Sequence, residues 1–303
     1  MTTSEDVRAS AERIAGRVRR TPILRDGSAL FKLEYLQHTG SFKARGMLNR
    51  ILAAAQRGEL PTAGIVAASG GNAGLAAAYA AREAGVPAEV YVPVTAPPVK
   101  VAKLGKLGAR VVQIGDEYAE AYAAAIVQAE ATGALFCHAY DDPDMVAGNG
   151  SAGLELLDEG GFDTVLVAVG GGGLAAGVAA ALHGHARVVA VEPRTCASLA
   201  AALAAGEPVD VPVSGVAADS LGARRIGTLP FEVAVRTRMA SVLVDDQAIV
   251  DARRRLWEDY RIVVEHGAAT AQAALTSGAY VPAAGERVVV LLCGANTNPA
   301  DLA

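Results

Sequence analysis

The sequence predicts an α/β fold with mainly parallel, twisted sheets flanked by helices. Short apolar runs alternate along the chain with Ala-rich segments of helical periodicity, which is typical of parallel strands joined by helices. Of the 303 residues, 52% are hydrophobic but only 5% are aromatic, so Ala, Val and Leu must build the core, as buried parallel sheets require. The length suits one large domain or two modest ones.

The alternation assigns the elements in order. The apolar runs predict strands at 88–92, 111–114, 164–169, 187–191 and 288–292. The segments between them predict helices at 73–84, 99–107, 117–131, 174–181 and 246–259. We find no internal repeat and no low-complexity linker, and we interpret the Ala-rich segments as packed helices.

Charge and composition exclude several classes of function. The net charge of −5 without a basic cluster argues against nucleic acid as a partner. No apolar run reaches the ~20 residues that span a bilayer, and the polar, acidic N-terminus is unlike a secretory signal. The cysteines Cys137, Cys196 and Cys293 show neither metal-ligand spacing nor an even disulfide set, so we expect a reduced, cytoplasmic protein.

Lys43 and a distant glycine run are the most informative features. Lys43 lies in the small, polar, Gly-flanked segment 39–46, which predicts a tight turn, and its amine could form an imine with an aldehyde. The strand at 164–169 runs into four glycines, Gly170, Gly171, Gly172 and Gly173. Such a loop before a helix can wrap a phosphate with backbone N–H groups. Pyridoxal 5′-phosphate (PLP) carries both an aldehyde and a phosphate, so we predict PLP as the cofactor.

Both features allow other interpretations. Most lysines are solvated surface charges, and we expect this of Lys32, Lys100, Lys103 and Lys106. Burial of Lys43 would lower the pKa of its amine and leave more of it as a free nucleophile. A glycine loop could also bind a dinucleotide, and Glu192 falls near the position of the acidic residue in that fingerprint. However, the spaced Gly-x-Gly-x-x-Gly pattern is not cleanly present.

These motifs belong to a longer ordered series that covers nearly the whole chain. The series is Arg20–Ile23, Phe31–Glu34 with 37–43, Ala68–Gly74, Asp141–Asp144 with 147–150, Gly170–Gly173 and Cys293–Asn296. In this order it resembles the fold type II (β-family) PLP enzymes, and among them the serine/threonine dehydratases and serine racemases. The resemblance implies a tryptophan synthase β-like fold. A small domain, 64–138, would be inserted in a large PLP-binding domain of 1–63 and 139–303, with the site in the cleft between them.

The resemblance also implies which residues bind the cofactor. Lys43 would form the Schiff base, beside Phe42 on one face of the ring, and Asn72 would hydrogen-bond the phenolic oxygen. Cys293 would face the pyridine nitrogen, and Glu265 would lie near the ring in a supporting position. The phosphate would be held by Gly170, Gly171, Gly172 and Gly173, with Leu174 at the start of the helix that follows.

The substrate loop follows the apolar run 65–68. The start of a helix binds anions, so this loop could hold the substrate carboxylate, and Ser69 adds a catalytic hydroxyl. An ordinary helix N-cap is the alternative, and both roles can hold together. The residues assigned to the substrate are Ser69, Gly70, Gly71, Asn72 and Ala73.

Three positions depart from the family pattern or test it. Serine racemases carry a second serine where Gly70 stands, which argues against racemisation as the main activity. Cys293 is not a carboxylate, so the pyridine would stay neutral and prompt loss of a β-hydroxyl would be favoured. Related enzymes bind a divalent cation through a glutamate at Glu192 and an aspartate where this chain has Ser198. We therefore predict no metal site, and a solvated or helix-capping Glu192 is the alternative.

Together these residues predict a lyase of amino-acid catabolism. It would deaminate L-threonine or L-serine by PLP-dependent β-elimination to a 2-oxo acid and ammonia, with Lys43 as the base that removes the Cα proton. The alternatives are a specialised hydroxy-amino-acid lyase, a serine racemase, a cysteine-synthase-like β-replacement enzyme and a non-catalytic PLP-binding sensor. The family implies a homodimer, and the chain's end shortly after Cys293 implies the short type without a regulatory domain.

Overall fold

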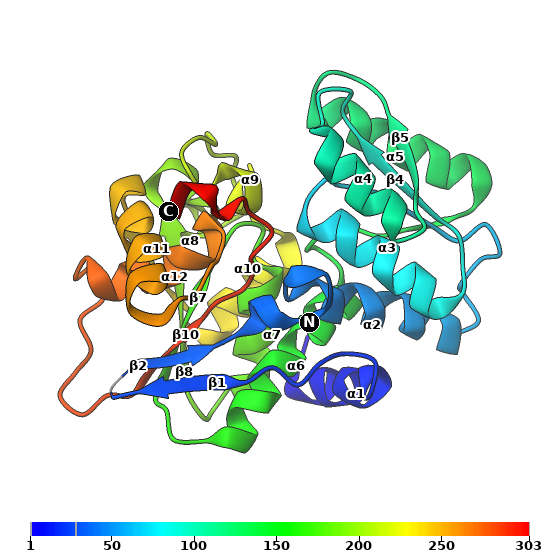
Figure 1. The fold of residues 1–303 in the computed structure, drawn as a ribbon. Helices are drawn as coiled ribbons and strands as arrows, with labels where there is room; N and C mark the ends of the chain where they lie inside the picture. Colours follow the sequence, from blue (N-terminus) through cyan, green and yellow to red (C-terminus); the bar gives the residue numbers. More distant parts are fainter. Residues whose placement is uncertain (1, 28, 303) are drawn as a thin grey trace.

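The computed structural model describes residues 2–27 and 29–302, which fold around two separate sheets (Figure 1). The strand order is β1-β2-β10-β7-β8-β9 in the large sheet and β5-β4-β3-β6 in the small one. All neighbouring strands are parallel except the β1–β2 pair. The predicted α/β fold with mainly parallel sheets is confirmed.

The large sheet draws its strands from both ends of the chain. They are β1 (Ile23–Asp26), β2 (Ala29–Lys32), β7 (Thr164–Ala168), β8 (Arg187–Pro193), β9 (Ala240–Val244) and β10 (Val288–Leu291). β10 lies between β2 and β7, so that Val290 is paired with both Phe31 and Leu166. Strands buried on both faces require continuous apolar runs, which is why β7 and β10 read as Val- and Leu-rich segments.

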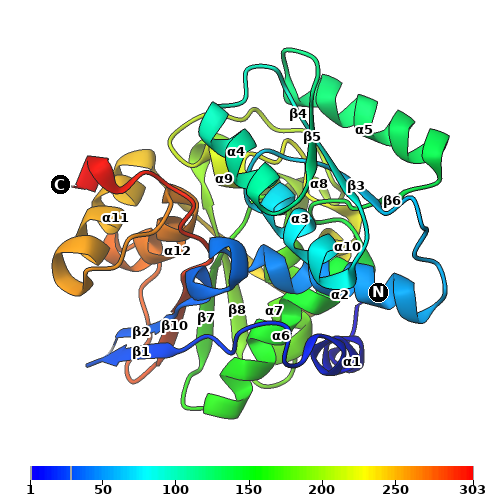
Figure 2. The same ribbon diagram turned by 45° about the vertical axis from the view of Figure 1, so that its right-hand side comes forward.

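Helices cover both faces of the large sheet (Figure 2). On one side lie α11 (Asp246–Tyr260) and α12 (His266–Thr276), and on the other lie α6 (Pro143–Glu159), α7 (Gly173–Leu182) and α10 (Thr228–Thr237). The remaining helices associated with this sheet are α1 (Ser4–Ile14), α2 (Lys43–Gln56), α8 (Ser198–Ala205) and α9 (Ala218–Leu221). Short 3-10 turns span Glu34–Leu36, His38–Gly40, Arg194–Cys196 and Pro299–Leu302.

The small sheet and its helices form a lobe of their own, coloured cyan to green in Figure 1. Its strands are β3 (Ile65–Ala68), β4 (Ala88–Val92), β5 (Arg110–Gln113) and β6 (Leu135–Phe136). One face of the sheet packs on α3 (Asn72–Ala84) and α4 (Pro98–Lys106), and the other packs on α5 (Tyr118–Thr132).

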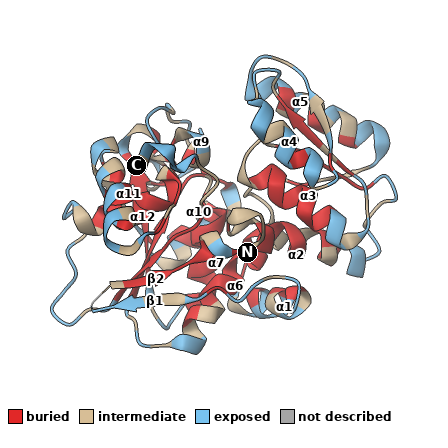
Figure 3. Ribbon diagram, in the orientation of Figure 1, coloured by how far each residue is buried: buried red, intermediate tan, exposed pale blue. Residues whose placement is uncertain are grey.

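The buried core continues from the small lobe into α2 (Figure 3). Met47, Leu48 and Ile51 on α2 pack in the same apolar cluster as Leu75 of α3 and Val90 of β4. α2 therefore lies against both parts of the molecule, and its N-terminus is placed between them.

The predicted strands and helices are all present, with ends that differ by one or two residues. The prediction of a tight turn at Lys43 is wrong, because Lys43 is the first residue of α2. The turn lies just before it, where Thr39 and Gly40 adopt left-handed conformations with φ of 64° and 77°. No helix among the described residues is long and apolar enough to cross a membrane.

Candidate active site

The predicted site residues lie at the carboxyl ends of strands from both sheets. β7 leads into Gly170, β10 leads into Cys293, and β3 leads into Ser69. Parallel α/β sheets bind their ligands at this edge, because the loops and helix N-termini that follow the strands converge there. Lys43 reaches the same place from the N-terminus of α2.

Backbone contacts with the closing segment hold Lys43 in position. Ser41 forms an antiparallel bridge with Gly294, and the Phe42 N–H donates to the Cys293 carbonyl at 3.0 Å. The Lys43 ammonium donates to the Ala139 carbonyl at 2.6 Å and lies 5.1 Å from the centre of the Phe42 ring. The lysine side chain is therefore directed at the segment that connects the two lobes.

The amine of Lys43 is easier to deprotonate than an ordinary lysine. Burial lowers its pKa to about 8, although the neighbouring Cys293 and Glu265 act in the opposite direction. Desolvation penalises the charged form of an amine, so a larger fraction is a free nucleophile near neutral pH. This is the property that condensation with an aldehyde requires.

The glycine loop offers free backbone N–H groups at the start of α7. Gly172 adopts a left-handed φ of 88°, and a Cβ on Gly173 would lie 2.8 Å from the Tyr140 carbonyl oxygen. Within residues 2–27 and 29–302, the N–H groups of Gly171, Gly172 and Gly173 have no protein acceptor. Free N–H groups at the positive end of a helix suit a phosphate, and Leu174, buried behind them, continues the helix.

Two adjacent residues connect Lys43 to the glycine loop. Ala139 accepts the Lys43 hydrogen bond, and the ring of Tyr140 lies so close to Gly171 that any side chain there would collide with it. The amine and the anion-binding loop thus lie on either side of one dipeptide. The arrangement fits PLP, a single small molecule with an aldehyde and a phosphate.

Hydrogen bonds with two other side chains hold Asn72 in position. Asn72 donates through Nδ2 to Glu265 Oε1 at 2.7 Å, and its Oδ1 accepts from Asn296 Nδ2 at 2.7 Å. Asn296 also donates to the Thr39 carbonyl at 2.7 Å, and the Glu265 N–H donates to the Gly294 carbonyl at 3.1 Å. Burial raises the pKa of Glu265 to about 7, opposed by the Asn72 hydrogen bond.

The loop after β3 has the properties of a carboxylate site. Ser69 is half-buried, and its Oγ accepts from the Gly71 N–H at 3.2 Å. In the part of the chain that the structure describes, the N–H groups of Asn72 and Ala73 at the start of α3 have no acceptor. Gly70 is not required by packing, since an added Cβ would lie 3.4 Å from Val92, an ordinary contact distance.

Cys293 is buried beside Lys43, with 3% of its surface exposed. Burial raises the pKa of its thiol well above the ordinary value, so the side chain is neutral. A neutral thiol is a weak hydrogen-bond donor. It is suited to a pyridine nitrogen that stays unprotonated.

Glu192 has the helix-capping arrangement. Its carboxylate accepts from the Leu199 N–H at 2.7 Å, from the Ala200 N–H at 2.9 Å and from Ser241 Oγ at 2.5 Å. Ser198 donates to the Gly170 carbonyl at 2.7 Å, which ties this helix start to the glycine loop. Among the described residues, no group of three or more His, Cys, Asp or Glu side chains could hold a metal ion.

The expectation that Lys32 is a surface charge is wrong. Lys32 is buried and pairs with Glu155 at 2.5 Å, and Glu155 also accepts from Arg45 at 2.7 Å. Arg45 in turn pairs with the buried Glu34 at 2.8 Å. This cluster joins β2 and α6 to α2 two residues after Lys43, so it fixes the helix that carries the amine. Lys103 and Lys106 are exposed, as expected.

Three residues of the site have no role in the sequence-based prediction. Tyr140 contacts the glycine loop, Asn296 holds Asn72, and the His138 Nδ1 accepts from the Asp141 N–H at 2.8 Å. The only sequence signal was their position, because Asn296 belongs to the Cys293 motif and His138 and Tyr140 lie just before the Asp141 motif. The contacts of Tyr140 and Asn296 join segments far apart in the chain, which no local pattern can reveal.

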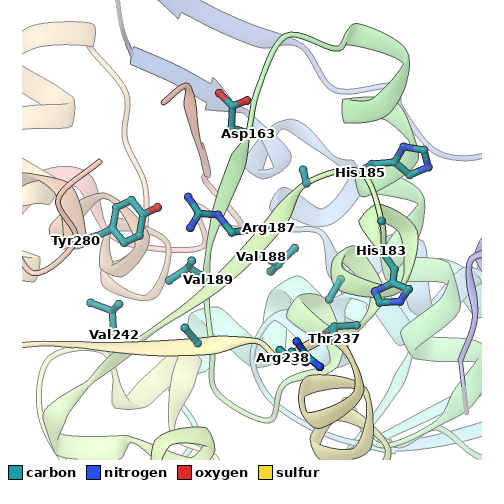
Figure 4. A pocket seen from close by; sticks show the side chains of 14 residues that line it. Asp163, His183, His185, Arg187, Val188, Val189, Thr237, Arg238, Val242 and Tyr280 are labelled. Carbon is teal, nitrogen blue, oxygen red and sulfur yellow. The ribbon is translucent and has the colours of Figure 1, made fainter. Parts of the chain in front are cut away.

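A surface cavity of about 690 Å³ lies at the opposite edge of the large sheet (Figure 4). It is lined by residues such as Asp163, His183, His185, Arg187 and Tyr280. These residues lie near the amino ends of β7 and β8, away from the edge where parallel sheets bind ligands. Neither Lys43 nor the glycine loop borders this cavity.

Comparison with known proteins agrees with the geometry. A family model described as "Pyridoxal-phosphate dependent enzyme" matches residues 14–294. L-threonine ammonia-lyase of Geobacter sulfurreducens is 37% identical over 300 residues, which cover 95% of this chain and 74% of the relative. Phenylserine dehydratase of Ralstonia pickettii is 36% identical over 277 residues, 90% of this chain and 84% of the relative.

The fold has close solved counterparts. The structure of maize serine racemase superposes with a TM-score of 0.91 at 30% identity, and the match covers 99% of this chain and 95% of that one. The family and the cofactor predicted from the sequence are therefore confirmed. The chain belongs to the pyridoxal-phosphate dependent enzymes, and its fold is that of the fold type II members of this family.

Proposed function

We propose that this protein is a PLP-dependent ammonia-lyase that converts L-threonine and L-serine to the 2-oxo acid and ammonia. The observation that carries the proposal is the state and position of the Lys43 amine. Burial lowers its pKa to about 8, and it donates a hydrogen bond to Ala139, whose neighbour Tyr140 contacts the glycine loop. The similarity to an L-threonine ammonia-lyase supports the same reaction.

The residues of the site have separate roles in the reaction. When bound, PLP supplies an aldehyde that condenses with amines and a ring that withdraws electrons from the substrate Cα. Lys43 would hold the cofactor and would accept the substrate Cα proton at Nζ. The N–H groups of Gly171, Gly172 and Gly173 would hold the phosphate. Asn72, which is fixed by its hydrogen bonds to Glu265 and Asn296, would orient the ring.

The substrate is oriented from the small lobe. The N–H groups at the start of α3 and the Ser69 hydroxyl would bind its carboxylate, and Lys43 would take the Cα proton. The Cα proton and the β-hydroxyl would be lost together as one water, and one water would be consumed when the enamine product is hydrolysed, so the net products are a 2-oxo acid and ammonia. The buried, neutral thiol of Cys293 would support this elimination, because it would not protonate the pyridine.

Elimination is favoured over racemisation at this site. The structure has room for a serine side chain at Gly70, yet the chain places no proton donor there. Inversion at Cα needs a second base on the opposite face of the substrate.

The organisation of the whole protein belongs to the same proposal. We propose a small domain of residues 64–138 inserted in a large domain of 1–63 and 139–303, a homodimer, and a cytoplasmic location. All strands of the small sheet fall within residues 64–138. The three cysteines are free and buried, which agrees with a reducing compartment.

The test is the replacement of Lys43 by alanine. We expect Lys43→Ala to lose the visible absorbance of lysine-bound PLP and to release no 2-oxo acid from L-threonine or L-serine. Lys103→Ala removes an exposed lysine and should keep both properties. Full activity of Lys43→Ala would remove the basis of the proposal.

A further inference from the structure

An aromatic cluster borders Lys43 on the side of the small lobe. Tyr118 and Tyr122 lie one turn apart on α5 with ring centres at 5.9 Å, and Tyr122 contacts Phe136 edge-to-face at 5.5 Å. His138 lies 6.2 Å from Tyr122 and 4.7 Å from Tyr140, again edge-to-face. These five side chains are called the aromatic cluster below.

The aromatic cluster reaches the reacting amine. The Ala139 carbonyl that accepts the Lys43 hydrogen bond at 2.6 Å lies between His138 and Tyr140 in the chain. Tyr140 in turn packs on Gly171 of the glycine loop. One end of the aromatic cluster is thus at the site of chemistry, and the other end, on α5, is at the surface.

The composition and exposure of the aromatic cluster indicate a ligand. The whole chain has only 8 Tyr, 5 Phe and 1 Trp, and four of these are gathered here. The other aromatic side chains of the small lobe are Tyr79 and Tyr91, which are buried, and most of the lobe's remaining buried residues are Ala, Val and Leu. Tyr118 is 54% exposed and the other four side chains are half-buried, so their ring faces are not fully used in packing. Partly exposed rings beside a reacting group mark a binding surface for an apolar group.

We propose that the aromatic cluster binds an aryl group on the β-carbon of the substrate, so that the preferred substrates are 3-aryl-3-hydroxy amino acids. The inference rests on the proposed ammonia-lyase function and specifies its substrate class. Aromatic rings pair favourably at centre distances of about 4.5–7 Å. The hydrogen of serine and the methyl of threonine are too small to contact several rings at once.

The test compares three substrates on the PLP-loaded enzyme by ammonia release. We expect kcat/KM for L-threo-3-phenylserine to exceed that for L-threonine and L-serine by about 10-fold or more.

Tyr122→Ala should lower this preference about 3- to 10-fold, mainly through KM, and Tyr122→Phe should restore it. Tyr118→Ala, at a largely exposed position, gives the same test with little effect on folding. Tyr260→Ala removes a ring that packs on Phe31 and should leave the preference unchanged.

A binding measurement separates this inference from the proposed function. L-phenylalanine lacks the β-hydroxyl and cannot eliminate water, so it reports binding alone. It should bind the loaded enzyme more tightly than L-alanine, and Tyr122→Ala should remove most of that difference.

A preference for threonine or serine, or an equal loss for all three substrates in Tyr122→Ala, would overturn the inference and leave the lyase function intact. Failure of all three substrates to release ammonia would overturn the lyase function, whereas tight binding of L-phenylalanine would still support the aryl site.

Discussion

Glu265 is the carboxyl most strongly affected by its position in this site. It is 8% exposed, it accepts from Asn72, and burial raises its pKa to about 7. The carboxyl therefore holds a proton through the acidic range in which most glutamates are ionised. The Glu265 carboxyl, which is hydrogen-bonded to Asn72, therefore titrates close to neutral pH.

This shift has a defined effect on stability. The folded protein binds the Glu265 proton more tightly than the unfolded chain, where the pKa is near its ordinary value of 4.5. The stabilisation is therefore complete below pH 4.5 and is lost as the pH rises to about 7, which amounts to about 3 kcal/mol. We expect Glu265→Gln to remove this part of the pH dependence in urea unfolding of the apoenzyme.

The control for this experiment is Glu258→Gln, because Glu258 is exposed on α11. It should keep the pH dependence of the native protein. If Glu265→Gln unfolded with the same pH dependence as the native protein, the raised pKa of Glu265 would be wrong.

Single residues were predictable where a local motif identifies them. Lys43 and Gly170 stand out from their sequence neighbours, so their chemistry could be inferred before the fold was known. Lys32 could not be distinguished from a surface lysine, because its partner Glu155 is on a distant helix. The contact of Tyr140 with Gly171 likewise joins two segments that are distant in the chain.

At the scale of elements, the start of α8 shows how one side chain can organise a helix and a loop. Glu192 at the end of β8 accepts from the first free N–H groups of α8, and Ser198 on the same helix donates to the Gly170 carbonyl. Side-chain acceptors at a helix N-terminus satisfy donors that have no partner within the helix. The position of the glycine loop therefore depends on this cap.

Replacement of Glu192 by alanine should destabilise the protein without affecting any metal. The N–H groups of Leu199 and Ala200 and the Ser241 hydroxyl would lose their acceptor, and we expect the free energy of unfolding to fall by about 3 kcal/mol in thermal or urea denaturation. Glu232→Ala, at an exposed position on α10, should have little effect. The native enzyme should keep its activity in EDTA. Loss of activity in EDTA with recovery in Mg²⁺ would show that Glu192 has a cation-binding role.

Elements with a simple pattern were the ones that the sequence predicted. The apolar runs of β4 and β7 and the Ala-rich periodicity of α3 identify those elements directly. α2 was not recognised, because Lys43, Arg45 and Gly46 lie at its start, and charges and glycine usually indicate a surface turn. Arg45 is tolerated there because it is paired with Glu34 and Glu155.

At the scale of the whole molecule, the two lobes are joined by a shared core. Ile14, Met47, Leu48 and Ile51, which precede the small sheet in the chain, pack in the same cluster as the apolar face of that sheet. Met145 of α6 completes the cluster from the other side. The small lobe therefore depends on α2 for part of its burial.

We expect residues 64–138 expressed alone not to fold cooperatively. Without α2, the apolar face formed by α3 and the small sheet would be exposed, and a small domain has little stability to lose. Circular dichroism during urea titration would show a gradual change. A matched fragment, 43–138, which adds α2, should be more ordered. A sharp unfolding transition of 64–138 with dispersed amide resonances would contradict the shared-core argument.

The amide chain through Asn72 has a consequence for how this site can change. Asn72, Glu265 and Asn296 come from three segments that are distant in sequence, and each satisfies a hydrogen-bonding group of another. A substitution at one position leaves a hydrogen-bonding group of another without its partner, so its effect depends on the residues present at the other two. The three positions form an epistatic unit, and directed evolution of this enzyme should randomise them jointly, because single-site scans would discard changes that succeed only in combination.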